Sequence, residues 1–429
     1  MTRTQNGKRV GIWLFIIATL YFAAFIFPNS LGAKSERMLL ATSLDEPITY
    51  PHVVRMLTPA KDIKDFFSRW VIYGDYHYGY PFYFLSALTV LPVRLIYGGE
   101  FVNYTAVNLL LLRQFISVLP LIIAILLLVY EQTNFRSFWE ATGLTLLMFI
   151  VPAFVRNHIQ WWHPDALSVL SVVFVLVFLR RDEFKFGRYF WLAAIACGIS
   201  VGIKLAGAFF FITIPYYLFM AYRQKKITLI GVVKKATLFV VVALLALVVS
   251  NPFIYNAGAR QELMRIQMEK MEVLRNGYED GSPYYQKGPA FWSWTLSTWY
   301  GHPIFLIFLG FSLVAGCLWG SNTLLNRLIL SYIVPHAIYL LWFVAVKPDH
   351  YWLPIMVPLF STAMIIPKVL IGGRFTKRVK SSWLRRTFLV LSLIILGIQA
   401  VNFLVRPYSG VVAQYQRGLQ IELALKLEQ

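Results

Sequence analysis

An acidic pair, Asp45 and Glu46, is the clearest candidate for chemistry in this chain. It lies in a polar stretch, Ser30–Tyr80, of a protein with 40 Lys and Arg residues against 20 Asp and Glu. A carboxylate within hydrogen-bond reach of a hydroxyl group can take its proton while the oxygen attacks a carbon atom. Neighbouring helical positions point about 100° apart, so the two acids need not share a role. The alternative is that the pair caps a short helix, with Asp45 at its start and Pro47 in its first turn.

The composition shows what kind of protein surrounds this pair. Of 429 residues, 58% are hydrophobic and only 14% are charged, and the mean hydropathy is +0.61, which is typical of a polytopic membrane protein. The net charge of +20 comes from basic residues in short loops between apolar runs, which argues against nucleic-acid binding. Cys197 and Cys317 lie inside apolar runs and have no metal-type spacing.

About a dozen apolar runs approach the roughly 20 residues that a spanning helix needs. They predict an all-α polytopic membrane protein of about 11–13 transmembrane helices. With no separate soluble module, residues 1–429 are expected to form one membrane domain. The candidate spans are Val10–Phe27, Tyr80–Tyr97, Val107–Tyr130, Phe138–Val155, Ala166–Leu179, Tyr189–Ile203, Leu205–Tyr222, Leu229–Ser250, Pro303–Trp319, Leu328–Val346, Trp352–Leu370 and Thr387–Val405.

Clusters of basic residues predict the orientation of these spans. Arg180–Arg188, Arg223–Lys235 and Arg374–Arg386 should lie in the cytoplasm. The residues before Val10 are also basic, which favours an uncleaved anchor. Counting from these loops places five segments outside: 30–80, 156–165, 251–302, 346–351 and the tail after 406. The same count requires an odd number of crossings between residues 80 and 130, where two runs are found, so one of them should not cross.

Two cations within apolar sequence need a partner. A charge at the centre of a membrane helix costs about 2.5–3.5 kcal/mol on insertion scales, so Lys204 should face a cavity or a partner. The alternative is a lysine that extends from a helix end to the membrane surface. Arg113 also lies within an apolar run and needs an acidic partner or a cavity.

Several short motifs follow one another in an order found in a known superfamily. Together they resemble the GT-C superfamily of glycosyltransferases that use polyprenyl-phosphate sugars, and are similar to protein O-mannosyltransferases and lipid A aminoarabinose transferases. The motifs are the acidic pair after the first span, Tyr78-Gly79-Tyr80-Pro81-Phe82-Tyr83-Phe84, Arg113, Pro152 with Asp165, the Gly-rich run Cys197–Lys204, and Lys347-Pro348-Asp349-His350-Tyr351-Trp352-Leu353-Pro354.

The resemblance implies a fold and an activity. The fold would be a GT-C-like bundle with short juxtamembrane helices in the first external loop, 30–80, and a second external loop, 251–302. The activity would be inverting transfer of a hexosyl or pentosyl group from a polyprenyl-phosphate carrier to a hydroxyl acceptor on a lipid, glycan or protein. The site would face the extracytoplasmic side of the plasma (inner) membrane.

The resemblance also implies site residues. Asp45 and Glu46 would be catalytic, with Asp45 as the base. The predicted substrate-binding residues are Lys204, Lys347, His350, Tyr351, Asp165, His163, Arg113, Asp75 and His77. Lys204 and Lys347 would hold the lipid phosphate, Tyr351 would stack on the sugar, and His163 with Asp165 would orient its hydroxyls.

Some features depart from the family pattern or have a second interpretation. Asp75 and His77 stand where the aminoarabinose transferases carry a Glu–Lys pair, and the late motif carries Lys and His where relatives often carry Arg. Lys347 and His350 could be interfacial anchors, and Asp165 could be a helix N-cap.

No cofactor is predicted, and metal binding is not indicated, because the His and Asp residues show no i,i+4 ligand spacing. Some GT-C enzymes do use a divalent ion, so that alternative stays open. The competing function is a transporter or flippase of a lipid-linked sugar. Transporters tend to show matching halves, and the two halves of this chain do not look alike. A third interpretation is a relative that binds a lipid-linked sugar without turnover.

Overall fold

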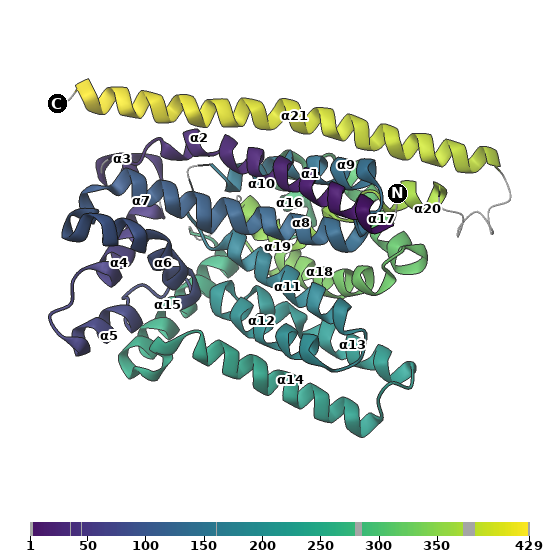
Figure 1. Cartoon of the computed structure of the whole chain (residues 1–429), viewed down its shortest axis with the longest axis horizontal. Helices are drawn as coiled ribbons and strands as arrows, with labels where there is room; N and C mark the ends of the chain where they lie inside the picture. Colours follow the sequence, from purple (N-terminus) through teal and green to yellow (C-terminus); the bar gives the residue numbers. More distant parts are fainter. Residues whose placement is uncertain are drawn as a thin grey trace.

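The computed structural model describes residues 3–34, 36–43, 45–159, 161–278, 285–371 and 382–427, and these contain helices and no strand. The helices pack side by side into an elongated bundle (Figure 1). The long bundle helices are α1 (Arg3–Ala24), the series α7 (Thr105–Leu112), η2 (Arg113–Val118) and α8 (Leu119–Thr133), α9 (Phe138–Phe149) with α10 (Pro152–Asn157), α11 (Asp165–Asp182), α12 (Arg188–Lys204), α13 (Phe210–Arg223), α14 (Leu229–Val249), α17 (Pro303–Trp319), α18 (Thr323–Phe343), α19 (Leu353–Phe360) with α20 (Ile365–Ile371), and α21 (Ser382–Leu427).

Seven helical segments of the described chain are long and apolar enough to cross a membrane, or eight if the bent pair α16 (Pro289–Trp299) and α17 counts as one span. The segments are 7–30, 80–103, 105–133, 229–249, 323–343, 349–371 and 383–405. These segments confirm the predicted all-α polytopic class. Other predicted spans fall below this length or carry charges at their ends: α9 has 12 residues, α12 has 17, and α11 ends in Arg180, Arg181 and Asp182.

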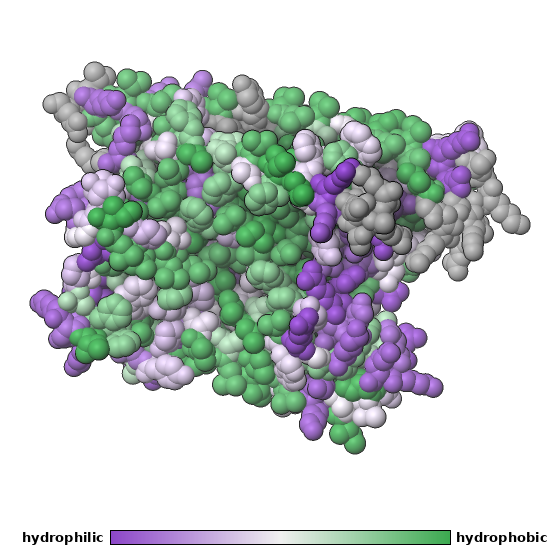
Figure 2. Space-filling view, viewed as in Figure 1, coloured by the Kyte–Doolittle hydropathy of each residue, from purple (hydrophilic) through white to green (hydrophobic). Residues whose placement is uncertain are grey.

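The surface shows how the bundle meets a bilayer. An apolar band crosses the middle of the molecule, and hydrophilic side chains gather toward its two ends (Figure 2). Helix α14 illustrates the band, because Phe239 is its single buried residue while Val233, Val240 and Leu245 are exposed. An exposed apolar surface of this kind faces lipid in a membrane protein.

One end of the bundle, here called the basic end, is formed by the loops α8–α9, α11–α12 and α13–α14. Buried Glu131 joins two of its helices by accepting from Arg180 (3.1 Å) and Arg181 (2.8 Å). Its backbone carbonyl also accepts from the Asn322 amide (2.9 Å), just before the start of α18. These contacts bring together loops that the charge pattern placed on the same side of the membrane.

The opposite end, here called the site end, carries the short helices of the first polar loop: α3 (Glu36–Thr42), α4 (Glu46–Leu57) and α5 (Ile63–Val71). These are the predicted juxtamembrane helices. Helix α15 (Ala257–Asn276), from the second polar loop, lies at the same end. The second half of α21 also reaches it, where Glu422 accepts from Lys34 Nζ (2.8 Å).

Helix α6 (Tyr80–Tyr97) lies in the region where the sequence left the crossing count open. Just before its start, Gly79 N–H donates to the carbonyl of Ile203 (3.3 Å), and near its end Arg94 donates to the carbonyl of Leu57 (3.1 Å). Both partners belong to the site end, so α6 begins and finishes there. The series α7–η2–α8 runs on to the basic end in Figure 1.

Two predicted spans have different boundaries in the structure. The run Phe138–Val155 is broken after Phe149, since Pro152 has no N–H to continue the helix and begins α10 instead. The run Trp352–Leu370 is divided between α19 and α20. The break before α10 comes shortly before Trp161 and His163, which belong to the candidate site.

Candidate active site

Glu46 and Arg113 form the buried foundation of the site end, and both side chains are 0% exposed. Arg113 Nε and Nη2 donate to the two Glu46 carboxylate oxygens at 2.8 and 2.5 Å. Arg113 Nη1 donates to the carbonyls of Asn29 (2.8 Å) and Leu31 (2.9 Å), and Trp162 N–H donates to Glu46 Oε1 (2.8 Å). This network fixes α4 against α2 (Ile26–Ser30), η2 and the loop before α11. Both carboxylate oxygens of Glu46 are occupied by hydrogen bonds, so this side chain is suited to a structural role. Glu46 is also the acidic partner that the sequence required for Arg113.

Asp45 differs from its neighbour, because its side chain is only half-buried. It occupies the N-cap position of α4 but makes no capping hydrogen bond. The carboxylate instead accepts from the indole Nε1 of Trp161 at 3.3 Å. The helix-capping interpretation therefore describes the position of Asp45 and not its side chain, which remains available to a ligand.

Asp165, at the start of α11, gathers a second group of side chains. One carboxylate oxygen bonds the ammonium group of Lys204, and the other lies 2.6 Å from His163 Nδ1. His163 Nε2 lies 2.7 Å from the Tyr78 hydroxyl. The order Asp165–His163–Tyr78 places the imidazole proton on Nδ1, facing the carboxylate, so that Tyr78 donates to Nε2.

The protonation states of this chain of contacts follow from burial. Burial lowers the pKa of His163 below its ordinary value, so the ring is neutral near pH 7. Burial, reinforced by the charge of Asp45, raises the pKa of Tyr78 well above its ordinary value, so the hydroxyl keeps its proton. With that proton directed at His163, the Tyr78 oxygen can accept a hydrogen bond from a ligand hydroxyl.

Aromatic rings surround these polar groups. Trp161 stacks on His163, with ring centroids 4.5 Å apart, and meets His350 edge-on at 4.8 Å. His350 also lies 5.4 Å from His163. Lys204 lies over the ring of Tyr351, 5.3 Å from its centroid, and its side chain is 25% exposed. The predicted residues Lys204, His163, Asp165, His350 and Tyr351 are thus brought together beside Trp161, which holds Asp45.

The approach of α6 to α12 explains how distant motifs meet. A side chain at Gly79 would collide with the carbonyl of Gly202, so the backbone contact between Gly79 and Ile203 depends on glycine. Tyr78 precedes this contact and Lys204 follows it. Two motifs separated by more than a hundred positions in the sequence therefore deliver their polar side chains to one place.

Lys270, on α15, is a cation of the site that the sequence analysis missed. It bonds the backbone carbonyl of His77 and lies 4.9 Å from the centroid of the Tyr78 ring. Burial lowers its pKa to about 8, with a further contribution from the nearby charge of Lys204. The signal in the sequence was weak, since a lysine on an amphipathic helix usually faces water.

Asp75 and His77 form a hydrogen-bonded pair that meets the site through Lys270. Asp75 is buried and accepts from the Tyr83 hydroxyl, and His77 Nδ1 lies 2.6 Å from its other oxygen. Burial alone would raise the pKa of Asp75, but the hydrogen bonds from His77 and Tyr83 hold it below its ordinary value. The pair positions the backbone carbonyl that Lys270 contacts.

Lys347 contacts a different set of groups from those of the cluster. Its ammonium group bonds the carbonyl of Ala345 and lies 5.3 Å from the centroid of the Trp292 ring. The predicted partnership of Lys347 with Lys204 is therefore not reproduced by the contacts seen here. In the late motif, Asp349 pairs instead with Arg156 (2.8 Å), which stacks over Trp299 at 4.5 Å.

The arrangement has a defined chemical capacity. It combines a half-buried carboxylate, two cations, a hydroxyl oriented as an acceptor, and aromatic rings suited to a sugar face. Among the described residues, no group of three His, Cys, Asp or Glu side chains could hold a metal ion.

Comparisons with known proteins bear on the fold. The chain matches no protein-family model, and a search of curated protein sequences finds no match. Among solved structures it is similar to the archaeal oligosaccharyltransferase AglB from Archaeoglobus fulgidus in complex with an inhibitory peptide and a dolichol-phosphate, with a TM-score of 0.52 and 12% identity over 93% of this chain and 56% of that chain.

Two further structures are similar at lower scores. The apo form of the Archaeoglobus fulgidus oligosaccharyltransferase gives a TM-score of 0.48 and 13% identity, covering 94% of this chain and 56% of that one. ArnT from Cupriavidus metallidurans bound to undecaprenyl phosphate gives 0.46 and 12%, covering 96% and 76%. The chain spans a little over half the length of the oligosaccharyltransferase. The similarity to AglB confirms the predicted fold class: this chain shares the helical fold of that archaeal membrane protein.

Proposed function

We propose that the protein is an inverting glycosyltransferase that moves a sugar from a polyprenyl-phosphate carrier to a hydroxyl acceptor. The observation that carries this proposal is the position of Asp45, whose half-buried carboxylate lies beside a cluster that contains the cations Lys204 and Lys270. Such a site needs one base for the acceptor and positive charge for the departing phosphate. The resemblance to the GT-C fold supports the same reaction class, and AglB, whose fold is similar, is described in complex with a dolichol-phosphate.

The proposed reaction is a single displacement. The acceptor oxygen forms a bond to the anomeric carbon of the sugar while the bond from that carbon to the phosphate oxygen breaks. The hydroxyl proton passes to the Asp45 carboxylate, and the bonding electrons leave with the phosphate. Lys204 and Lys270 stabilise the negative charge that grows on the phosphate oxygen, which is worth most in a partly dehydrated site.

The surrounding residues have positioning roles in this proposal. Glu46 and Arg113 hold the start of α4, so that Asp45 points toward Trp161. His163 and Asp165 orient the Tyr78 hydroxyl, whose oxygen accepts from a sugar or acceptor hydroxyl. Glu46 and Arg113, which the sequence pattern had suggested as catalytic and substrate-binding, act here through the geometry they maintain.

The orientation in the membrane belongs to the same proposal. Basic loops are retained on the cytoplasmic side, so the basic end of the bundle faces the cytoplasm. The site end then faces the extracytoplasmic side of the plasma (inner) membrane, where nucleotide sugars are absent and a lipid-linked sugar is the available donor. The transferred group is a hexosyl or pentosyl unit.

Replacing Asp45 by Asn tests the proposal directly. Membranes carrying the protein are given a labelled polyprenyl-phosphate sugar, and the release of polyprenyl phosphate is measured. Asp45→Asn should reduce release by about 10²–10⁴-fold, the usual contribution of a general base. Asp65→Asn is the matched control, since Asp65 lies in the same loop and pairs with Arg69 on its own exposed helix. Full release by Asp45→Asn would refute the assignment, and movement of labelled lipid across the membrane without sugar transfer would favour the transporter alternative.

A further inference from the structure

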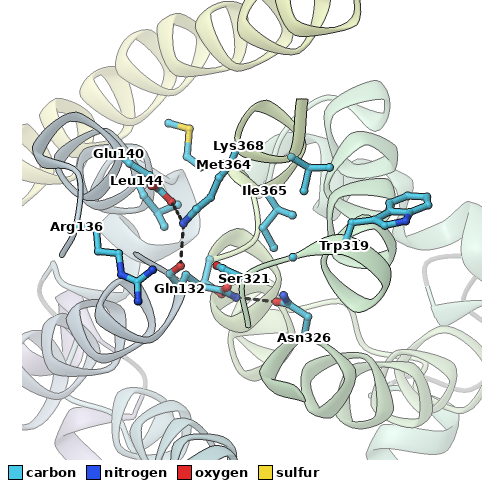
Figure 3. A pocket seen from close by; sticks show the side chains of 13 residues that line it. Gln132, Arg136, Glu140, Leu144, Trp319, Ser321, Asn326, Met364, Ile365 and Lys368 are labelled. Carbon is cyan, nitrogen blue, oxygen red and sulfur yellow. Dashed lines mark hydrogen bonds and ion pairs between the residues drawn. The ribbon is translucent and has the colours of Figure 1, made fainter. Parts of the chain in front are cut away.

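A separate cavity of about 420 Å³ lies at the basic end of the bundle. Side chains from α8, α9, α18 and α20 and from the turn between α17 and α18 converge on it (Figure 3). At this end Gln132, in the last turn of α8, meets Asn326 and Ser361. The cavity shares no residue with the Asp45 cluster, so it is not part of the proposed active site.

The floor of the cavity is polar although it is buried. Gln132 Nε2 donates to Asn326 Oδ1 (2.8 Å) and approaches Ser361 Oγ (3.4 Å). These three residues are 5%, 0% and 1% exposed. Burying three polar side chains in a helix bundle costs folding free energy unless their hydrogen bonds are completed. The floor is therefore a feature that packing alone does not explain.

One donor of this floor is left without a partner. The amide nitrogen of Asn326 has no hydrogen-bond partner among the described residues. Glycines keep space beside it, because a Cβ atom on Gly316 would lie 2.6 Å from this nitrogen and one on Gly320 would lie 3.2 Å from it. A buried N–H group of this kind needs an acceptor atom that the described residues do not supply.

The rim supplies positive charge. Arg136 and Lys368 both line the cavity, and Lys368 is held by Glu140 (2.7 Å) and by the carbonyl of Gln132 (3.4 Å), as Figure 3 shows. The formal charges of Arg136, Lys368 and Glu140 add up to one positive charge. A guanidinium group presents paired N–H donors that match the oxygens of a phosphate group.

The remaining wall is apolar. Leu144, Ile365 and Val369 line it together with Met364 and Trp319. A ligand that fits both surfaces has an oxygen-rich anionic group and an apolar portion beside it. From these contacts we propose that the cavity binds a phosphate group, with Arg136 and the Asn326 amide as donors to its oxygens. Anionic phospholipids present such a group at the cytoplasmic surface, and a free phosphorylated molecule offers the same chemistry.

The test uses the full-length protein in nanodiscs of phosphatidylcholine, with and without phosphatidylglycerol. Lipids retained after release from the discs are counted by native mass spectrometry. Arg136→Gln should reduce retention of phosphatidylglycerol by about tenfold, as expected for one lost charge-assisted hydrogen bond. Asn326→Leu should do the same. Arg188→Gln is the matched control, because Arg188 begins α12 at the same end of the bundle and contacts Tyr189.

A second arm distinguishes the two sources of phosphate. Inorganic phosphate is added to the protein in discs of phosphatidylcholine alone, and the unfolding temperature is measured. A rise that Arg136→Gln abolishes supports a free phosphorylated ligand, whereas selective retention of phosphatidylglycerol supports a lipid headgroup. The proposal is overturned if neither probe distinguishes Arg136→Gln from the wild type, or if Arg188→Gln loses as much as Arg136→Gln does. Because Arg136 is exposed, its replacement should leave folding intact.

Discussion

The two ends of the bundle treat buried carboxylates in opposite ways. At the basic end, Glu131 is bound by Arg180 and Arg181, which close the loops around it. At the site end, Asp165 binds Lys204 and His163. His163 in turn contacts the Tyr78 hydroxyl and stacks on Trp161, whose indole donates to the half-buried Asp45. The first arrangement ends in arginines that join helices. The second ends in groups that a ligand can reach.

The same contrast appears between two neighbouring residues. The Glu46 side chain is fully buried and accepts from Arg113 and Trp162, whereas the Asp45 carboxylate is half-buried and accepts from the Trp161 indole. A buried ion pair with both oxygens satisfied is costly to break, and a half-buried carboxylate is free to exchange protons. We conclude that the acidic pair divides a structural task and a chemical task between its members.

The largest expected effect is on stability, from breaking the pair that holds α4. Arg113→Leu leaves the Glu46 charge buried without a partner, so the free energy of unfolding should fall by about 3–5 kcal/mol. Thermal unfolding in detergent measures the loss. The double variant Glu46→Gln with Arg113→Leu should recover part of it, because no buried charge remains. An unchanged unfolding temperature in Arg113→Leu would contradict the structural role.

Replacing one cation at each end of the bundle tests whether the site end acts in turnover and the basic end in stability. Lys204→Met should reduce release of polyprenyl phosphate by about 10²–10³-fold, the usual cost of one lost donor to a developing oxyanion. Arg181→Gln should instead lower the unfolding temperature and leave the release rate per folded molecule unchanged. Equal effects of the two variants on turnover would remove the distinction between the ends.

The pH dependence reports on Lys270. Burial lowers its pKa to about 8, so it is charged below that value and loses its charge as the pH rises through it. Release should therefore decline above about pH 8. Lys270→Arg should move this decline to higher pH, since a guanidinium group keeps its proton. A decline at the same pH in Lys270→Gln would assign it to another group.

The smallest expected effect concerns a single neutral hydrogen bond. Tyr78→Phe removes the hydroxyl that His163 orients, and the rate should fall by up to about tenfold. Because the Tyr78 ring also contacts Phe82, the aromatic replacement preserves the packing. Release rates at low and high donor concentration separate weaker binding from slower transfer, and no change in either would exclude Tyr78 from the site.

Much of the fold was predictable because its signals are local. The starts and ends of α6 and α17 coincide with predicted apolar runs, and the basic loops gave the two ends of the bundle. The path of α6 was not predictable, because its apolar length says nothing about the contacts at Gly79 and Arg94 that keep it at the site end.

The site was predictable in part. Motif order singled out Lys204 and Asp165, and His163 was proposed beside Asp165; the structure brings the three into contact. It did not separate the roles of Asp45 and Glu46, because identical chemistry one position apart is distinguished only by burial. Lys270 was missed since its partner is the backbone carbonyl of His77, a contact that leaves no trace in residue types.

The most direct test of the account is the position of a bound polyprenyl phosphate in an experimental structure of this protein. The phosphate should lie against Lys204 and Lys270, with Asp45 facing the side from which an acceptor hydroxyl would approach the attached sugar. A phosphate held at Lys347, with Lys204 still bound only to Asp165 and Asp45 turned toward water, would contradict it.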